Sequence, residues 1–309
     1  MKEVKNMISR RGFLKTGAAA TMVSGPYFTG RVFAEGTADL GVAAGTDILS
    51  AVKAAVAAVG GMGAFVKKGN RVAIKPNLSF ASPVERAATT NPEVVRAVMN
   101  LCLDAGARQV IVVDHPLQDA AIIGDKAQIA TVVKETKNAM LVLPISENLY
   151  KETAIPKGKV MKSTKVTRII EEVDVLINVP VAKSHSASFV SLGIKGNLGL
   201  VWDRIAYHNS ADFNQSLADL ATVIKADLTI VDAIRALTTR GPQGPGKVAE
   251  LNTIVAGIDP VATDAYAVQL TPWNNREAKG RNIQHLLYAS QMGLGEIDPS
   301  KLKVVKTTV

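Results

Sequence analysis

Along most of the chain, short runs of apolar residues alternate with longer segments in which apolar positions recur every three or four residues. Four runs are apolar almost without interruption: "RVAIKP" (71–76), "RQVIVVD" (108–114), "DVLINVPV" (174–181) and "DLTIVD" (227–232). Such runs are typical of parallel strands that are buried on both faces. The sequence therefore predicts an α/β fold: a mostly parallel sheet with helices on both faces, in a Rossmann-like three-layer sandwich.

Two of the predicted helices have clear start signals. In 91–106, Asn91 is suited to the cap, Pro92 to the first turn and Gly106 to the end. In 259–270, Asp259 and Pro260 have the same arrangement directly after a further predicted strand, "LNTIVAGI" (251–258). Between these elements, 150–166 is rich in lysine and fits a hairpin or a surface excursion. The Gly/Pro loop 238–248 is long enough to cover a site.

Open α/β sheets bind ligands beyond the carboxyl ends of their strands. Polar residues gather at the ends of the predicted strands, and we expect them along one edge of the sheet: Lys75, Asn77, Asp114, His115, Lys183, His185, Asp232 and Asp259. The stretch "VPVAKSHSASFVSLGIKGNLG" (179–199) adds Lys195, Asn197 and several glycines.

These residue types predict a site for a small anion. Lysine amines suit phosphate or carboxylate oxygens, so Lys75, Lys183 and Lys195 would neutralise the ligand while Asn77 and Asn197 orient it. Glycine lets the backbone approach a ligand closely. Neither a Walker A loop nor a Gly-x-Gly-x-x-Gly nucleotide fingerprint is present.

The sequence leaves open whether the protein is an enzyme. If it is one, His185 is the expected proton-transfer group, because its unperturbed pKa lies near neutral pH, with Asp232 or Asp259 orienting it. The alternatives are structural: a solvated lysine at each strand end, and a helix cap at Asp259. No His/Asp/Glu spacing typical of a metal site occurs, so we predict no metal.

Eight short motifs occur in a fixed order: "AIKPNL" (73–78), "TTNPEVVRAV" (89–98), "INVPVAKSH" (177–185), "SLGIKGNLGL" (191–200), "DLTIVDAI" (227–234), "RGPQGPG" (240–246), "AGIDPVATDA" (256–265) and "YASQMGLGEID" (288–298). Together they resemble the family called domain of unknown function 362, over roughly residues 40–305. The resemblance implies no particular activity. Many relatives carry ferredoxin-like cysteine motifs, whereas Cys102 is the only cysteine here, so one chain cannot build a cysteine-ligated iron–sulfur cluster. The sequence assigns no other cofactor, and we expect Cys102 in the core.

The N-terminus carries an export signal. Residues 9–15, "SRRGFLK", match the twin-arginine motif, and Val32-Phe33-Ala34 offers a cleavage site after Ala34. We therefore expect a signal peptide at 1–34 and a single α/β domain at 35–309. The protein would use the twin-arginine export machinery and work in the periplasm or otherwise outside the inner membrane. The apolar stretch is too short and too rich in small residues for a permanent membrane span.

Most of the net charge of +9 belongs to this signal. Residues 1–34 hold six Lys or Arg and one acidic residue, which leaves +4 for the mature chain. Aromatic residues are few and are not interleaved with basic ones, so we expect no nucleic-acid partner. The alternative function is a non-catalytic periplasmic binding or assembly factor for an exported redox protein, because no recognisable catalytic constellation is present.

Overall fold

The computed structural model describes residues 37–309, so the predicted signal peptide and cleavage site lie outside the described residues. Residues Ala38–Val309 cluster as one unit. No helix in this part of the chain has the length and apolar character needed to cross a membrane.

Most strands belong to one large sheet, which is buried at its centre. The strands are β1 (Leu40–Ala44), β2 (Arg71–Pro76), β3 (Gln109–Val113), β4 (Ala139–Val142), β5 (Tyr150–Ala154), β6 (Ser163–Thr167), β7 (Val175–Val179), β8 (Val181–His185), β9 (Phe189–Ser191), β10 (Leu228–Leu237), β11 (Val248–Gly257) and β12 (Val304–Thr308). Within the described residues, ten of them form a sheet in the order β12-β1-β11-β10-β7-β2-β3-β4, while β8 pairs with β10 and β9. The apolar runs of β2, β3, β7 and β10 are almost entirely buried, as predicted for central strands.

The sheet is mixed, although parallel pairs dominate its centre. β10, β7, β2, β3 and β4 run parallel to one another. In contrast, β11 runs antiparallel to both β10 and β1. The predicted α/β class is confirmed, but the sequence did not indicate β1, β12 or the reversed direction of β11.

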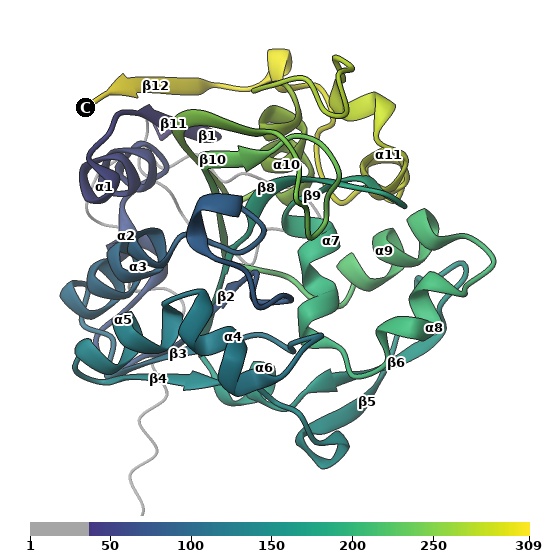
Figure 1. Cartoon of the computed structure of the whole chain (residues 1–309), viewed down its shortest axis with the longest axis horizontal. Helices are drawn as coiled ribbons and strands as arrows, with labels where there is room; N and C mark the ends of the chain where they lie inside the picture. Colours follow the sequence, from purple (N-terminus) through teal and green to yellow (C-terminus); the bar gives the residue numbers. More distant parts are fainter. Residues whose placement is uncertain (1–36) are drawn as a thin grey trace, which may run out of the picture. The chain divides into compact units, whose positions relative to one another are not determined.

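The helices lie on the two sides of this sheet. They are α1 (Ile48–Ala58), α2 (Met62–Phe65), α3 (Pro92–Asp104), α4 (Ala120–Lys126), α5 (Ile129–Glu135), α6 (Ile169–Glu172), α7 (Gly193–Gly196), α8 (Arg204–His208), α9 (Phe213–Ala221), α10 (Pro260–Val268) and α11 (Gln284–Gln291). Short 3-10 turns are η1 (Val84–Arg86), η2 (Glu147–Leu149), η3 (Asn197–Leu200), η4 (Gly280–Asn282) and η5 (Pro299–Lys301). In Figure 1, α1, α2, α3 and α5 lie on one side of the central strands, and α7, α9, α10 and α11 lie on the other.

The predicted helix ends are confirmed. The Asn91 side chain accepts a hydrogen bond from the Glu93 N–H (3.0 Å), and Pro92 begins α3. Gly106 follows the helix with φ +98°, a conformation in which other residues are strained. Cys102 on α3 is fully buried, as predicted, and burial raises the pKa of its thiol.

The two irregular segments also fold locally. β5 and β6 form an antiparallel hairpin, so the lysine-rich stretch 150–166 is a hairpin rather than an irregular excursion. The loop 238–248 joins β10 to β11, and its Gly241 N–H donates to Ser184 Oγ (2.9 Å). The loop therefore rests against β8 between Lys183 and His185.

Candidate functional site

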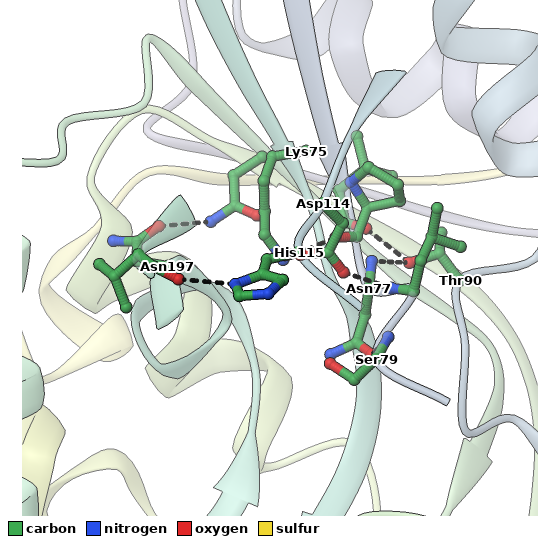
Figure 2. Close-up of polar contacts among 12 residues, drawn as sticks. Lys75, Asn77, Ser79, Thr90, Asp114, His115 and Asn197 are labelled. Atoms are coloured by element: carbon green, nitrogen blue, oxygen red, sulfur yellow. Dashed lines mark hydrogen bonds and ion pairs between the residues drawn. The ribbon is translucent and has the colours of Figure 1, made fainter. Parts of the chain in front are cut away.

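The foundation of the site is a buried ion pair between two adjacent parallel strands. β2 pairs with β3 at Ile74 and Val112, so Lys75 near the end of β2 lies beside Asp114, directly after β3. Lys75 Nζ is 3.2 Å from Asp114 Oδ1 and also donates to the Pro76 carbonyl oxygen (2.6 Å). Figure 2 shows the two side chains together. Burial lowers the pKa of Lys75, and the Asp114 charge partly opposes this shift.

A glycine closes over this ion pair from the other side. Gly199 lies in η3, whose backbone is held by the His115 N–H, which donates to the Gly199 oxygen (2.8 Å). A Cβ at position 199 would lie 2.6 Å from Lys75 Cε and would also overlap Asp114 Oδ1. Because any side chain would break the pair, the glycine here is needed for close approach.

Lys183 lies within β8 rather than after a strand, because the chain resumes pairing with β10 directly after Pro180. Its amine donates to the Ala88 carbonyl oxygen and to Asn77 Oδ1 (3.1 Å), and lies 5.1 Å from the centre of the Phe80 ring. Burial is the main cause that holds the pKa of Lys183 well below its ordinary value, and the Lys195 charge adds to it.

His185 ends the same strand, and its contacts define its tautomer. Nδ1 accepts from the backbone N–H groups of Ala187 (3.1 Å) and Ser188 (3.2 Å), so a neutral ring carries its proton on Nε2. Burial, followed by the positive charge of Lys195, lowers the pKa of His185 to about 2. The ring is therefore a neutral hydrogen-bond donor at neutral pH, whereas its expected role in proton transfer assumed a pKa near neutral pH.

Lys195 is the half-buried member of the group and lies on α7. Burial and then the positive charges of Arg204 and Lys75 lower the pKa of its amine to about 7. In the part of the chain that the structure describes, no atom hydrogen-bonds or ion-pairs with this amine.

Arg204 was missed by the sequence analysis and completes the cluster. It lies at the start of α8 with 7% of its surface exposed. Its Nη1 donates to Ser79 Oγ at 3.5 Å and its Nη2 is 3.9 Å from Asp114 Oδ1, yet Nε and Nη2 find no hydrogen-bond partner among the described residues.

The two asparagines are partly occupied by the protein itself. Asn77 Oδ1 accepts from Lys183, and the Thr90 hydroxyl accepts from the Asn77 N–H (2.8 Å). The Asn178 amide donates to Asn197 Oδ1 (3.3 Å) and to the Gly193 oxygen (3.0 Å). Figure 2 shows Asn77, Thr90 and Asn197 around the Lys75–Asp114 pair. Asn197 therefore belongs to the wall of the site, and its Nδ2 has no hydrogen-bond partner among residues 37–309.

The remaining predicted carboxylates serve the architecture. Asp232 lies within β10 and accepts from the Asn91 (2.7 Å) and Ile234 (3.1 Å) N–H groups, which fixes the start of α3, while burial raises its pKa to about 6. Asp259 caps α10. The expectation that it follows the carboxyl end of a parallel strand is wrong, because β11 is antiparallel to β10. Gly257 pairs with Thr229, Thr229 with Asn178 and Asn178 with Lys75, so β11 passes the level of Lys75 two residues before Asp259 and runs away from the carboxyl ends of the parallel strands.

The other histidines form no metal site. His115 stacks on Trp202, with 5.3 Å between ring centres. His208 lies 6.4 Å from the ring of His185. His285 on α11 is fully buried, neither of its ring nitrogens has a partner among the described residues, and burial lowers its pKa to about 3. No three metal-binding side chains of residues 37–309 gather as a metal ion requires.

The geometry thus collects positive charge at the carboxyl ends of β2, β3 and β8. The charge of Arg204 lowers the pKa of Lys75, Lys183 and Lys195, and Asp114 is the carboxylate that acts on all four groups. Lys75 and Lys183 are held by protein acceptors, while Lys195 and most of Arg204 are not. Such an arrangement can neutralise and hydrogen-bond an anion.

These features define an α/β protein with a mixed sheet and a cationic site at one strand edge. The chain belongs to the family described as Domain of unknown function (DUF362), whose model matches residues 72–269. A thylakoid-associated protein of Synechocystis sp. is 29% identical over 224 residues, which cover 70% of this chain and 68% of that protein.

Two solved structures are more distantly similar. The lactate racemase apoprotein of Thermoanaerobacterium thermosaccharolyticum has a TM-score of 0.45 and 15% identity, over 76% of this chain and 58% of that one. A Thermotoga maritima protein has a TM-score of 0.38 and 12% identity, over 60% of this chain and 49% of that one. The match thus spans about half the length of each of these two proteins.

Proposed function

We propose that this protein binds a small anion at the carboxyl ends of β2, β3 and β8, and that it does so outside the inner membrane after twin-arginine export. The observation that carries the first part is the buried guanidinium of Arg204. Its Nε and Nη2 lack hydrogen-bond partners among the described residues. A buried charge destabilises the folded protein by several kcal/mol unless it is paired and hydrogen-bonded. An anion that accepts hydrogen bonds from these nitrogens would therefore offset the desolvation free energy of the guanidinium.

Lys195 supplies the second contact to the anion. The residue is half-buried, and its amine interacts electrostatically with Arg204 and has no partner in the described part of the chain. An anion between the two would favour the charged form of Lys195 and raise its pKa. Lys75, Lys183 and Asp114 lie around them and hold the positions of the surrounding backbone, since each is already bonded to protein atoms.

Calorimetric titration of the mature protein with inorganic phosphate and with glutarate tests this proposal. A charge-assisted hydrogen bond contributes about 1.5–3 kcal/mol, so Arg204→Gln and Lys195→Gln should each weaken binding roughly tenfold to a hundredfold. Arg281→Gln is the matched control, because Arg281 is exposed and pairs only at the surface with Asp298. Binding of neither probe by the unmodified protein, or equal affinity in all variants, contradicts the proposal and favours the protein-binding assembly factor.

The export part rests on the motif at residues 9–15. Replacing both Arg10 and Arg11 by lysine keeps the charge but removes the guanidinium pair, so we expect the precursor to remain in the cytoplasm. Fractionation of cells that express the full chain measures this. The control is a chain with Lys2→Arg and Lys5→Arg, which lie outside the motif. Equal export of the two altered chains would show that the arginine pair is not an export signal.

A further inference from the structure

The three lysines of the site differ in what their amines touch. Lys75 is held by Asp114 and by the Pro76 oxygen. Lys183 is held by Asn77 and the Ala88 oxygen and is fully buried. Lys195 is half-buried and, among the described residues, its amine touches no acceptor. Lys195 is therefore the lysine whose nitrogen can reach a ligand without first breaking a bond to the protein.

The surroundings of Lys195 also favour the neutral amine, which is the nucleophilic form. The burial of the side chain is the main cause, the positive charges of Arg204 and Lys75 add to it and Asp114 partly opposes it, and the result is a pKa lowered to about 7. The position combines a nitrogen that no acceptor of the described residues holds with neighbours that destabilise its protonated form.

We propose that Lys195 forms an imine with the carbonyl carbon of a short oxo acid, so that the anion of this site is one that carries a ketone. This inference rests on the proposed anion site and names its ligand class. Arg204, whose Nε and Nη2 are unpartnered in the described part of the chain, binds the carboxylate of the oxo acid. His185 donates its Nε2–H to the carbonyl oxygen, since its Nδ1 is already occupied by two backbone N–H groups.

The covalent step needs no oxidant or reductant. The lone pair of Lys195 Nζ forms the new carbon–nitrogen bond, and the carbonyl π electrons move to oxygen, which takes up a proton from the nitrogen. The second amine proton then joins the hydroxyl group, which leaves as water, and a carbon–nitrogen double bond remains. Amine and ketone are thus converted to imine and water, with all atoms accounted for.

Reductive trapping tests the inference on the full mature chain. The protein is incubated with pyruvate or 2-oxoglutarate and sodium cyanoborohydride, and its intact mass and peptides are measured. We expect one reduced adduct per chain, located on Lys195. Lys195→Arg should lose the adduct but keep the positive charge, while Lys53→Met, at an exposed lysine of α1, should label as the unmodified protein does.

Parallel titration with glutarate, which has the same carbon chain as 2-oxoglutarate but no ketone, separates this inference from the anion proposal. Glutarate binding without any trapped adduct overturns the imine and leaves the anion site standing. An adduct spread over several surface lysines, or one that persists in Lys195→Arg, overturns it as well. Failure to bind either glutarate or phosphate together with failure to trap either oxo acid overturns both proposals.

Discussion

The buried carboxylates and the buried cations of this protein differ in how fully the protein hydrogen-bonds them. Three buried aspartates and the half-buried Asp259 each accept hydrogen bonds from two or more backbone N–H groups, and each fixes a turn or a helix start; the buried ones are Asp219, Asp232 and Asp264. At the carboxyl edge of the sheet, Arg204 is also buried but has two nitrogens without partners among the described residues. A buried charge that the chain satisfies holds the fold together, whereas one that it leaves unsatisfied indicates a missing ligand.

The largest expected effect is at Asp219, the most fully satisfied of these carboxylates. Its oxygens accept from the N–H groups of Lys159, Val160 and Met161 and from the Gln215 amide, which ties the β5–β6 hairpin to α9. Asp219→Ala leaves these donors unpaired, so the free energy of unfolding should fall by about 3–5 kcal/mol. Urea denaturation measures the loss.

Asp125→Ala, at an exposed position of α4, is the matched control and should change the free energy of unfolding by less than about 0.5 kcal/mol. Glutarate affinity of the folded Asp219→Ala protein should be unchanged, because Asp219 holds the architecture rather than the ligand. A stability loss no larger than that of the control would remove the distinction between the two kinds of buried charge.

Much of this architecture is encoded locally and was predicted from the sequence. The central strands are continuous apolar runs, and the start of α3 is set by Asn91 and Pro92, so both could be identified within a few residues. The direction of β11 could not. It depends on pairing with β1, which is more than 200 residues away along the chain, and the alternation of side chains is the same in either direction. That single reversal is why Asp259 does not lie beyond the carboxyl ends of the parallel strands.

The site was predicted only in part, because its contacts, like the direction of β11, depend on which strands are neighbours. Lys75 and Lys183 were found because each lies near a strand end, but their bonds to Asp114 and Asn77 depend on which strands are neighbours. Arg204 follows a loop and an irregular turn, so no strand pattern points to it. Its importance becomes visible only once its burial and its unpartnered nitrogens are known.

His285 extends the comparison of satisfied and unsatisfied buried groups to a side chain whose contribution to the free energy of unfolding depends on pH. Its folded-state pKa of about 3 lies below the unfolded value near 6.5, so the unfolded chain binds more protons between these values. The stability that the neutral ring contributes is present above pH 6.5 and is lost as the pH falls towards 3, by up to about 1.4 kcal/mol per pH unit.

Replacing His285 by leucine removes this loss together with two buried, unpartnered nitrogens. We expect the variant to exceed the unmodified protein in unfolding free energy by about 1 kcal/mol at pH 7 and by about 3 kcal/mol at pH 5. His185 shifts in the same direction and Asp264 in the opposite one, but both are present in the two proteins and cancel in the difference. A difference that does not grow between pH 7 and pH 5 would show that His285 becomes protonated without unfolding.

The smallest expected change in stability is at Arg204, and it gives the sharpest contrast with Asp219. Arg204→Met removes a charge from a site that is 7% exposed, which in a satisfied network would cost several kcal/mol. Here the lost contacts are a 3.5 Å bond to Ser79 and a 3.9 Å approach to Asp114, and Asp114 keeps Lys75 at 3.2 Å. We therefore expect the free energy of unfolding without ligand to stay within about 1 kcal/mol of the unmodified value, or to rise, while glutarate affinity is lost. Denaturation in the absence and presence of glutarate measures both quantities on one sample. If the free energy of unfolding of Arg204→Met without ligand falls by more than about 2 kcal/mol, Arg204 stabilises the fold as the aspartates do. Lys195 would then be the remaining cation of the site that is assigned to the anion.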